Sequence, residues 1–167
     1  MDSNLIVSYS SSAGYLAAKG EIHNLLTRFG DQKSRQELLV PGIIAVTTAL
    51  KSREVVEELH EIAANDPEAI KCTTQWVPAD NWCDATIDGI KNVIKEEIKD
   101  LFVADDQYAI EILQHRTSLK TDDILNAIKP FLKGRIVDRP MKILRIELFD
   151  KRASVTLLKP KDMFRRE

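Results

Sequence analysis

The pattern of apolar residues between Gln107 and Pro160 changes its period along the chain, and this limits the possible folds more than any other feature. Tyr108, Ile110 and Ile112 alternate with other residues, which predicts a strand with one buried face. A helical pattern follows, and then two further alternating segments. A strand, a helix and two strands in this order predict a small α/β unit.

The predicted helix of this stretch begins near Thr121 and ends before Gly134. Pro130 lies late in it and predicts a kink or a tightened last turn. The turn between the last two strands is expected at 150–152. The side chains expected to be buried on the helix and on these strands are Ile124, Ile128, Phe131, Leu132, Leu144, Ile146, Leu148, Val155 and Leu157.

Another helix precedes this stretch, and it has the most regular apolar spacing in the chain. Thr86 or Asp84 is placed to cap its first turn. We assign this helix to the same unit as the stretch that follows. Its expected buried side chains recur at steps of three and four, and they are Ile87, Ile90, Ile94, Ile98 and Leu101.

The first 77 residues follow a second pattern of elements. A strand is predicted at 5–9, a helix from Tyr15 to a stop at Gly30, a helix from a cap at Ser52, and a strand at 69–77. Extended segments at 36–40 and 43–49 flank a Pro-Gly break, and they form either a hairpin or one interrupted strand. With two strands there, the order is that of a ferredoxin-like domain.

The segment from Trp76 to Trp82 is the best candidate for a linker. Pro78 cannot donate a hydrogen bond to a strand ladder, and the polar residues after it disfavour a continuing strand. The sequence therefore predicts an α+β chain with domains at 1–79 and 80–167. The two tryptophans are expected to pack the units together, with base stacking as the alternative for either ring.

The amino-acid composition indicates which broad class of protein this is. The chain is 44% hydrophobic and 30% charged, which is typical of a globular protein. It shows neither a signal peptide nor an apolar run of the roughly 20 residues that a membrane helix needs, so we expect a soluble cytoplasmic protein without a membrane partner. Cys72 and Cys83 have no redox or zinc spacing and are expected to be reduced thiols.

Catalytic patterns are missing from the sequence. His23, His60 and His115 lie on separate predicted elements, and no glycine-rich phosphate loop occurs. We therefore expect no catalytic residue, no metal site and no cofactor. A stand-alone enzyme acting on a small anion is the weakest alternative.

The charges are distributed unevenly along the chain. Residues 107–167 carry 14 Lys and Arg against 8 Asp and Glu, whereas residues 1–106 carry 10 against 18. This asymmetry suggests a polyanion-binding half joined to an acidic half. The alternative is a solvated surface whose charges are divided by chance.

Basic residues cluster around the breaks of the second half, and clustered Lys and Arg at element ends can converge on a phosphate backbone. The helix start at 118–123 adds backbone N–H groups that suit a phosphate or a terminal ribose. The candidate RNA-binding residues are Arg116, Thr117, Ser118, Lys120, Lys129, Lys133, Arg135, Arg139, Lys142, Lys159, Lys161 and Arg165, with Arg166 beside them.

Short motifs run through this part of the chain, and they are Arg116-Thr117-Ser118, Gly134, Val137-Asp138, Pro140, Ile146-Glu147, 155–160 and 161–164. With these motifs the chain resembles the THUMP domain, an RNA-binding module of tRNA-modifying enzymes and their adaptors. The first part resembles the ferredoxin-like domain that commonly precedes a THUMP domain. The resemblance implies that Arg116 and the helix after it contact the 3′ end of a tRNA.

The two-domain arrangement is most similar to the adaptor of tRNA cytidine acetylation and its archaeal relatives. This resemblance implies a non-catalytic protein that holds the acceptor stem and 3′ end of tRNA for a separate modifying enzyme, with an acetyltransferase as one candidate. Because the chain ends at Glu167, we expect no catalytic domain in it. The chief alternative is a non-RNA scaffold that mediates assembly through its two α/β units.

Overall fold

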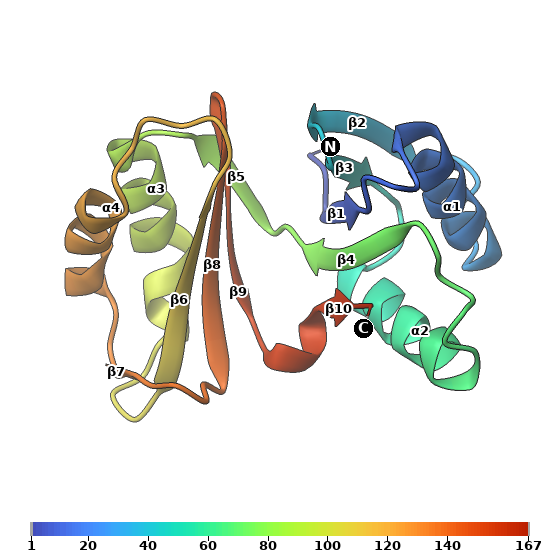
Figure 1. Cartoon of the computed structure of the whole chain (residues 1–167). Coiled ribbons are helices and arrows are strands. Elements are labelled where there is room, and N and C mark those ends of the chain that lie inside the picture. The colour runs from blue at the N-terminus through green and yellow to red at the C-terminus, as the bar shows by residue number, and fades with distance from the viewer. Residues whose placement is uncertain (1, 167) are drawn as a thin grey trace. The chain divides into compact units, whose positions relative to one another are not determined.

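The computed structural model describes residues 2–166, and these form two compact units (Figure 1). The first unit contains residues up to Ala79 together with the segment from Lys161 onward. The second unit contains Asp80–Pro160. Each unit has its own sheet and its own buried core.

The first unit has the predicted order of strands and helices. Its elements are β1 (Leu5–Tyr9), α1 (Tyr15–Arg28), β2 (Arg35–Val40), β3 (Ile43–Thr47), α2 (Ser52–Asn65) and β4 (Thr73–Pro78). The two extended segments form a hairpin through Gly42, and every strand pair is antiparallel. With β4, β1, β3 and β2 adjacent in that order, this is a ferredoxin-like unit.

The C-terminal segment adds a fifth strand to this first sheet. β10 (Phe164–Arg165) pairs with β4, where Phe164 lies opposite Trp76. Met163 and Phe164 are buried. Residues 161–166 therefore pack in the first unit, whereas the sequence assigned them to the second domain, and their apolar side chains explain the difference.

The connection between the two units is shorter than the predicted linker, because β4 continues through Pro78 and β5 (Asn81–Asp84) begins after two residues. Pro78 pairs with Leu5 on β1 and lies beyond the part of β4 that pairs with β10. Because β10 does not reach Pro78, the missing N–H of this residue interrupts no hydrogen-bond ladder between β4 and β10. Trp76 lies in the core of the first unit with its side chain fully buried, and its indole N–H donates to Thr73 Oγ1 at 2.9 Å. Burial of this ring rules out the base-stacking alternative for Trp76.

The second unit contains a mixed sheet in the order β5-β9-β8-β6-β7. Its further elements are α3 (Ile87–Val93), β6 (Gln107–Gln114), α4 (Thr121–Ile128), β7 (Arg135–Ile136), β8 (Lys142–Phe149) and β9 (Arg152–Leu158). β6 runs parallel to β7 and β8, and the remaining pairs are antiparallel. Side chains of α3 and α4 pack with one face of the sheet in the core.

The regular helix predicted through Leu101 is interrupted. Thr86 caps α3 by accepting from the N–H of Gly89, but α3 ends at Val93 and continues as a π-helical segment, Ile94–Ile98, and a 3₁₀ turn, Lys99–Leu101. The wider π turn shifts the buried stripe by a residue. Leu101 is consequently 51% exposed, and Phe102 takes the buried position.

The second predicted helix has the tightened last turn expected from Pro130. α4 ends at Ile128, and a 3₁₀ turn follows at Lys129–Phe131. The chain next reaches Gly134 with φ 101°, and the N–H of Arg135 donates to the carbonyl of Asp106 at 2.9 Å. No helix in the described part of the chain is long and apolar enough to cross a membrane.

Gly134 is required by its position, and replacing it with alanine should destabilise the protein. A Cβ there would lie 2.4 Å from the Asp106 carbonyl oxygen, and the left-handed backbone adds strain. We expect Gly134→Ala to lower the free energy of unfolding by about 2 kcal/mol or more. The matched control is Gly20→Ala within α1, where a Cβ meets nothing within 4 Å, and it should stabilise by roughly 0.5–1 kcal/mol. Urea unfolding measures both, and equal effects would contradict the account.

Asp31 makes the stability of the first unit depend on pH. Its buried carboxylate accepts from the Thr48 hydroxyl at 2.5 Å and from the N–H groups of Lys33 and Ala49. The hydrogen bond from Thr48, followed by those from the two backbone N–H groups, holds the pKa of Asp31 below its ordinary value against the opposing effect of burial.

Because the folded-state pKa of Asp31 is lowered, its stabilising contribution is present above the unfolded pKa and is lost as pH falls through the folded pKa. We expect Asp31→Asn to lower the free energy of unfolding by about 1–3 kcal/mol at pH 7. The difference from the parent should shrink as pH falls below about 4. The exposed control Asp2→Asn should have nearly the same unfolding free energy as the parent at every pH. A difference between Asp31→Asn and the parent that does not change with pH would contradict the stabilising role of the Asp31 carboxylate.

Candidate nucleic-acid interface

Strand β6 divides the predicted RNA-binding residues of the second unit into two groups. Arg116, Thr117, Ser118 and Lys120 follow its carboxyl end, whereas β7 and the start of β8 pair beside its amino end. The strand has eight residues, which corresponds to about 23 Å between its ends. The predicted residues therefore lie in two groups at opposite ends of β6, which Figure 1 shows as a single long strand of the sheet.

The loop at the carboxyl end of β6, residues 115–120, is fixed by several hydrogen bonds. The amide of Gln114 donates to the carbonyl of Leu119 at 2.6 Å, and Thr117 Oγ1 accepts from the N–H of Leu119 at 3.3 Å. The N–H of His115 donates to the carbonyl of Leu148 at 2.7 Å. These contacts order the backbone of the loop while Arg116 and Ser118 stay exposed.

The side chain of His115 connects the loop to a buried network of charged side chains, which contains Glu147, Arg145 and Glu111. Its ring stacks on Phe149 with centroids 5.2 Å apart, and its Nε2 lies 3.2 Å from a carboxylate oxygen of Glu147. Glu147 also accepts from Arg145, whose guanidinium donates to Glu111 at 3.0 Å. Arg145 and Glu147 are both nearly inaccessible to solvent. Buried charges need such partners, because a buried charge without a partner lowers the stability of the fold.

Arg116 has a backbone conformation that side chains rarely adopt. With φ 60°, it is the one non-glycine residue in the left-handed region within the described part of the chain. Such a conformation costs about 1 kcal/mol or more for an ordinary residue, and strain of this kind gathers at functional sites. Arg116 is exposed in a loop whose backbone is otherwise fixed by hydrogen bonds.

The first turn of α4 lies directly after this loop. Lys120 precedes the helix without forming a side-chain cap, and its carbonyl accepts from the N–H groups of Asp123 and Ile124. The earlier N–H groups of Thr121 and Asp122 have no partner among the described residues. Exposed N–H groups at a helix start suit a phosphate, although the carboxylates of Asp122 and Asp123 compete with an anion there.

The β8–β9 hairpin reaches the same end of the sheet, because Leu148 pairs with Gln114. Lys151 lies in its turn, and Arg152 begins β9 with its guanidinium 4.5 Å from the centre of the Trp82 ring. Trp82 in turn lies 6.1 Å from Phe149, so this tryptophan belongs to an aromatic group with His115. The candidate RNA-binding residues named from the sequence do not include Lys151 and Arg152, although basic residues at a predicted turn could have indicated them.

The other group of predicted residues lies at the amino end of β6. Lys142 is held within the fold, because its ammonium donates to the Leu101 carbonyl at 2.6 Å and to Asp106 at 2.7 Å. The Lys142 hydrogen bond is the main reason that the pKa of Asp106 lies below its ordinary value. We therefore interpret Lys142 as a structural residue. The exposed basic residues at this end are Lys129, Lys133, Arg135, Arg139 and Lys159.

The structure places the remaining predicted residues elsewhere. Lys161 lies in a 3₁₀ turn, Pro160–Asp162, and Arg165 lies on β10, both with the first unit. The uneven distribution of charge along the sequence also does not follow the boundary between the two units. Residues 80–160 carry 14 basic and 14 acidic side chains, so the second unit has no excess of positive charge.

The two cysteines lie in different units, and both are free thiols. Burial, together with the carboxylate of Asp84, raises the pKa of Cys83 to about 11. Burial is also the main cause of the raised pKa of Cys72. Among the described residues, no group of three or more His, Cys, Asp or Glu side chains is arranged to hold a metal ion.

These two units define an α+β fold in which a ferredoxin-like unit is followed by a THUMP-like unit, as the sequence predicted. Solved structures share this fold. PH1313 from Pyrococcus horikoshii matches with a TM-score of 0.61 and 13% identity, over 94% of this chain and 54% of that one. TrmN from Thermus thermophilus matches with a TM-score of 0.57 and 8% identity, over 94% and 46%.

A predicted N6-adenine-specific DNA methylase from Listeria monocytogenes matches with a TM-score of 0.52 and 10% identity, over 94% of this chain and 40% of that one. This chain thus corresponds to about half, or less, of the length of these structures. Identities this low show a shared fold. No protein-family model and no curated protein matches the sequence.

Removing one charge from the buried network beneath the loop should destabilise the second unit, because the remaining charge is left buried without its partner. Arg145→Met leaves Glu147 buried without its main cationic partner, and we expect a loss of about 3–5 kcal/mol in the free energy of unfolding. The exposed control Lys129→Met should change it by less than about 0.5 kcal/mol. In a double-mutant cycle, Glu147→Leu should recover part of the loss, and additive effects would show that the pair is not coupled.

Proposed function

We propose that this protein is a non-catalytic tRNA-binding protein that holds the acceptor stem and 3′ end of tRNA for a separate modifying enzyme. The resemblance of Arg116-Thr117-Ser118 and the following segments to the THUMP domain supports this, as does the THUMP-like fold of the second unit. The observation that carries the proposal is the loop at 115–120, which presents Arg116 in a strained, fixed conformation.

The carboxyl end of β6 has the chemistry that an RNA terminus needs. The Arg116 guanidinium can bind a phosphate through two parallel N–H donors. The N–H groups at the start of α4 and the hydroxyl of Ser118 lie on the following residues and can take a second oxygen or a ribose hydroxyl. A-form RNA is recognised mainly by such phosphate and 2′-OH contacts, so a base-specific pocket is not needed here.

The amino end of β6 forms a second set of phosphate contacts in this proposal. Lys133, Arg135 and Arg139 are exposed there, about 23 Å from the Arg116 loop. One phosphate cannot reach both groups. We therefore assign the 3′ end to the Arg116 loop and the flanking duplex to the other group.

The chemistry on the tRNA belongs to a partner enzyme in this proposal, because the sequence offers neither a nucleophile with a base nor a metal cluster. The resemblance to the adaptor of cytidine acetylation makes an acetyltransferase the first partner to test. No catalytic residue or cofactor is assigned to this chain.

A second candidate function is a scaffold that binds no RNA, and the charge balance favours it. The second unit is neutral overall, and net positive charge supplies much of the salt-dependent affinity of nucleic-acid-binding proteins. The two functions are separated by a titration of labelled total tRNA at low salt. Absence of binding by the parent protein would favour the scaffold.

Substitution of Arg116 by glycine should separate RNA binding from stability. Arg116→Gly removes the guanidinium and relieves the left-handed strain, so the unfolding free energy should stay equal or rise by about 1 kcal/mol. Affinity for tRNA should fall roughly tenfold or more in a fluorescence polarisation titration. Lys133→Gln, at the other end of β6, should weaken binding by a smaller factor. Unchanged affinity of Arg116→Gly would reject the proposed contact.

A further inference from the structure

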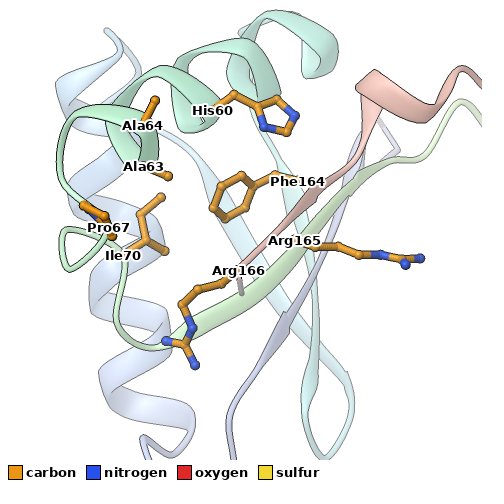
Figure 2. A pocket seen from close by; sticks show the side chains of 8 residues that line it. All are labelled: His60, Ala63, Ala64, Pro67, Ile70, Phe164, Arg165 and Arg166. Atoms are coloured by element: carbon orange, nitrogen blue, oxygen red, sulfur yellow. The ribbon is translucent and has the colours of Figure 1, made fainter.

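A pocket of about 360 Å³ lies in the first unit, outside the proposed interface (Figure 2). Residues of α2, of the segment between α2 and β4, and of β10 line it. Its volume is near the lower end of the roughly 300–1,000 Å³ typical of small-molecule sites. The pocket thus depends on the C-terminal strand that the sequence assigned to the other domain.

The floor and the rim of the pocket differ in chemistry. Ile70 and Phe164 are buried and, with Ala63, give an apolar floor. His60 and Arg166 lie at the edges of the pocket (Figure 2). They come from different parts of the chain, since His60 is on α2 and Arg166 directly follows β10. Aliphatic and aromatic surface next to a cation suits a flat ring that carries an anionic group.

Contacts within the first unit hold both polar groups in place. The His60 ring meets Phe164 edge to face, with centroids 5.5 Å apart, and its Nε2 lies 3.3 Å from the Lys161 carbonyl. Arg166 donates from its guanidinium to the Lys71 carbonyl, and its backbone N–H donates to Thr74 at 2.8 Å. A guanidinium has five N–H donors, so it can keep the Lys71 contact and still bind an anion.

Among the described residues that line the pocket, none carries a carboxylate. Arg165 also lines it, but its side chain points away from His60 and Phe164 (Figure 2). Arg166 therefore supplies a positive charge at the rim.

We propose that this pocket binds one unpaired nucleotide of the RNA, with the base against His60 and the apolar floor and the phosphate on Arg166. This inference rests on the proposed function, and it adds a site on the ferredoxin-like unit. Stacking of a base on an aromatic side chain is tolerant of sequence and contributes about 1–3 kcal/mol, so the site should accept any base. An acidic peptide would use Arg166 but would leave the floor uncovered.

The first test uses 5′-AMP with the full chain, and it does not depend on tRNA binding. We expect 5′-AMP to shift the backbone amide resonances of Ala63, Ala64, Ile70, Phe164 and Arg166 in a ¹⁵N NMR titration. Adenosine and ribose 5-phosphate, which each lack one half of the ligand, should bind at least about fivefold more weakly. Absence of shifts at these residues, or equal shifts with a polyglutamate peptide, would overturn the proposal.

The second test uses variants whose folding is checked by thermal unfolding. His60→Ala and Arg166→Gln should each weaken 5′-AMP binding about fivefold or more, while the exposed control Lys33→Gln should not. The same two variants should weaken tRNA binding. If the parent binds tRNA and the variants bind it equally well, the pocket inference fails while the proposed function stands. If the parent binds no tRNA, the proposed function fails, and with it the assignment of the nucleotide to RNA.

Discussion

The parallel pairing of β6 with β8 determines where the predicted RNA-binding residues of the second unit can lie. Seven residues of β6 pair in register with β8, and a parallel pair requires the chain to cross over the sheet between them. α4 makes that crossing. The loop before α4 therefore lies at one end of the sheet, and the segment after it returns to the other end, where Gly134 passes close to the Asp106 carbonyl. Residues close in sequence become separated by the length of a strand.

The network of polar contacts among Arg145, Glu147 and His115 then connects the sheet to the loop. Glu147 is buried and shares its oxygens between the guanidinium and the imidazole, so the position of His115 is determined by the sheet. Arg116 follows immediately with a left-handed backbone. An arginine held on such a support loses less conformational entropy on binding than one on a flexible loop. This preorganisation can offset the absence of net positive charge in the unit.

Local patterns predicted most of the fold, because the alternation of a strand and the periodicity of a helix can be read from residues close together in the sequence. These patterns could not predict β10, because β10 forms by pairing with β4, and Phe164 and Trp76 are far apart in the sequence. The π-helical segment was missed because the spacing of Ile94, Ile98 and Leu101 also fits an α-helix. For the site, the Arg116 loop could be proposed from sequence, but Lys142 could not be recognised as a partner of Asp106. Charge counts along a sequence do not show which end of a strand each charge occupies.

The central claim is that the loop at the carboxyl end of β6 contacts the 3′ end of tRNA. Photocrosslinking tests it directly, with benzoylphenylalanine placed at Ser118 in one variant and at Lys133 in another, both of which are exposed positions. The account predicts that crosslinks from position 118 map to the terminal nucleotides of tRNA and that those from position 133 map to the duplex. Terminal crosslinks from position 133 alone, or none from either position, would contradict it.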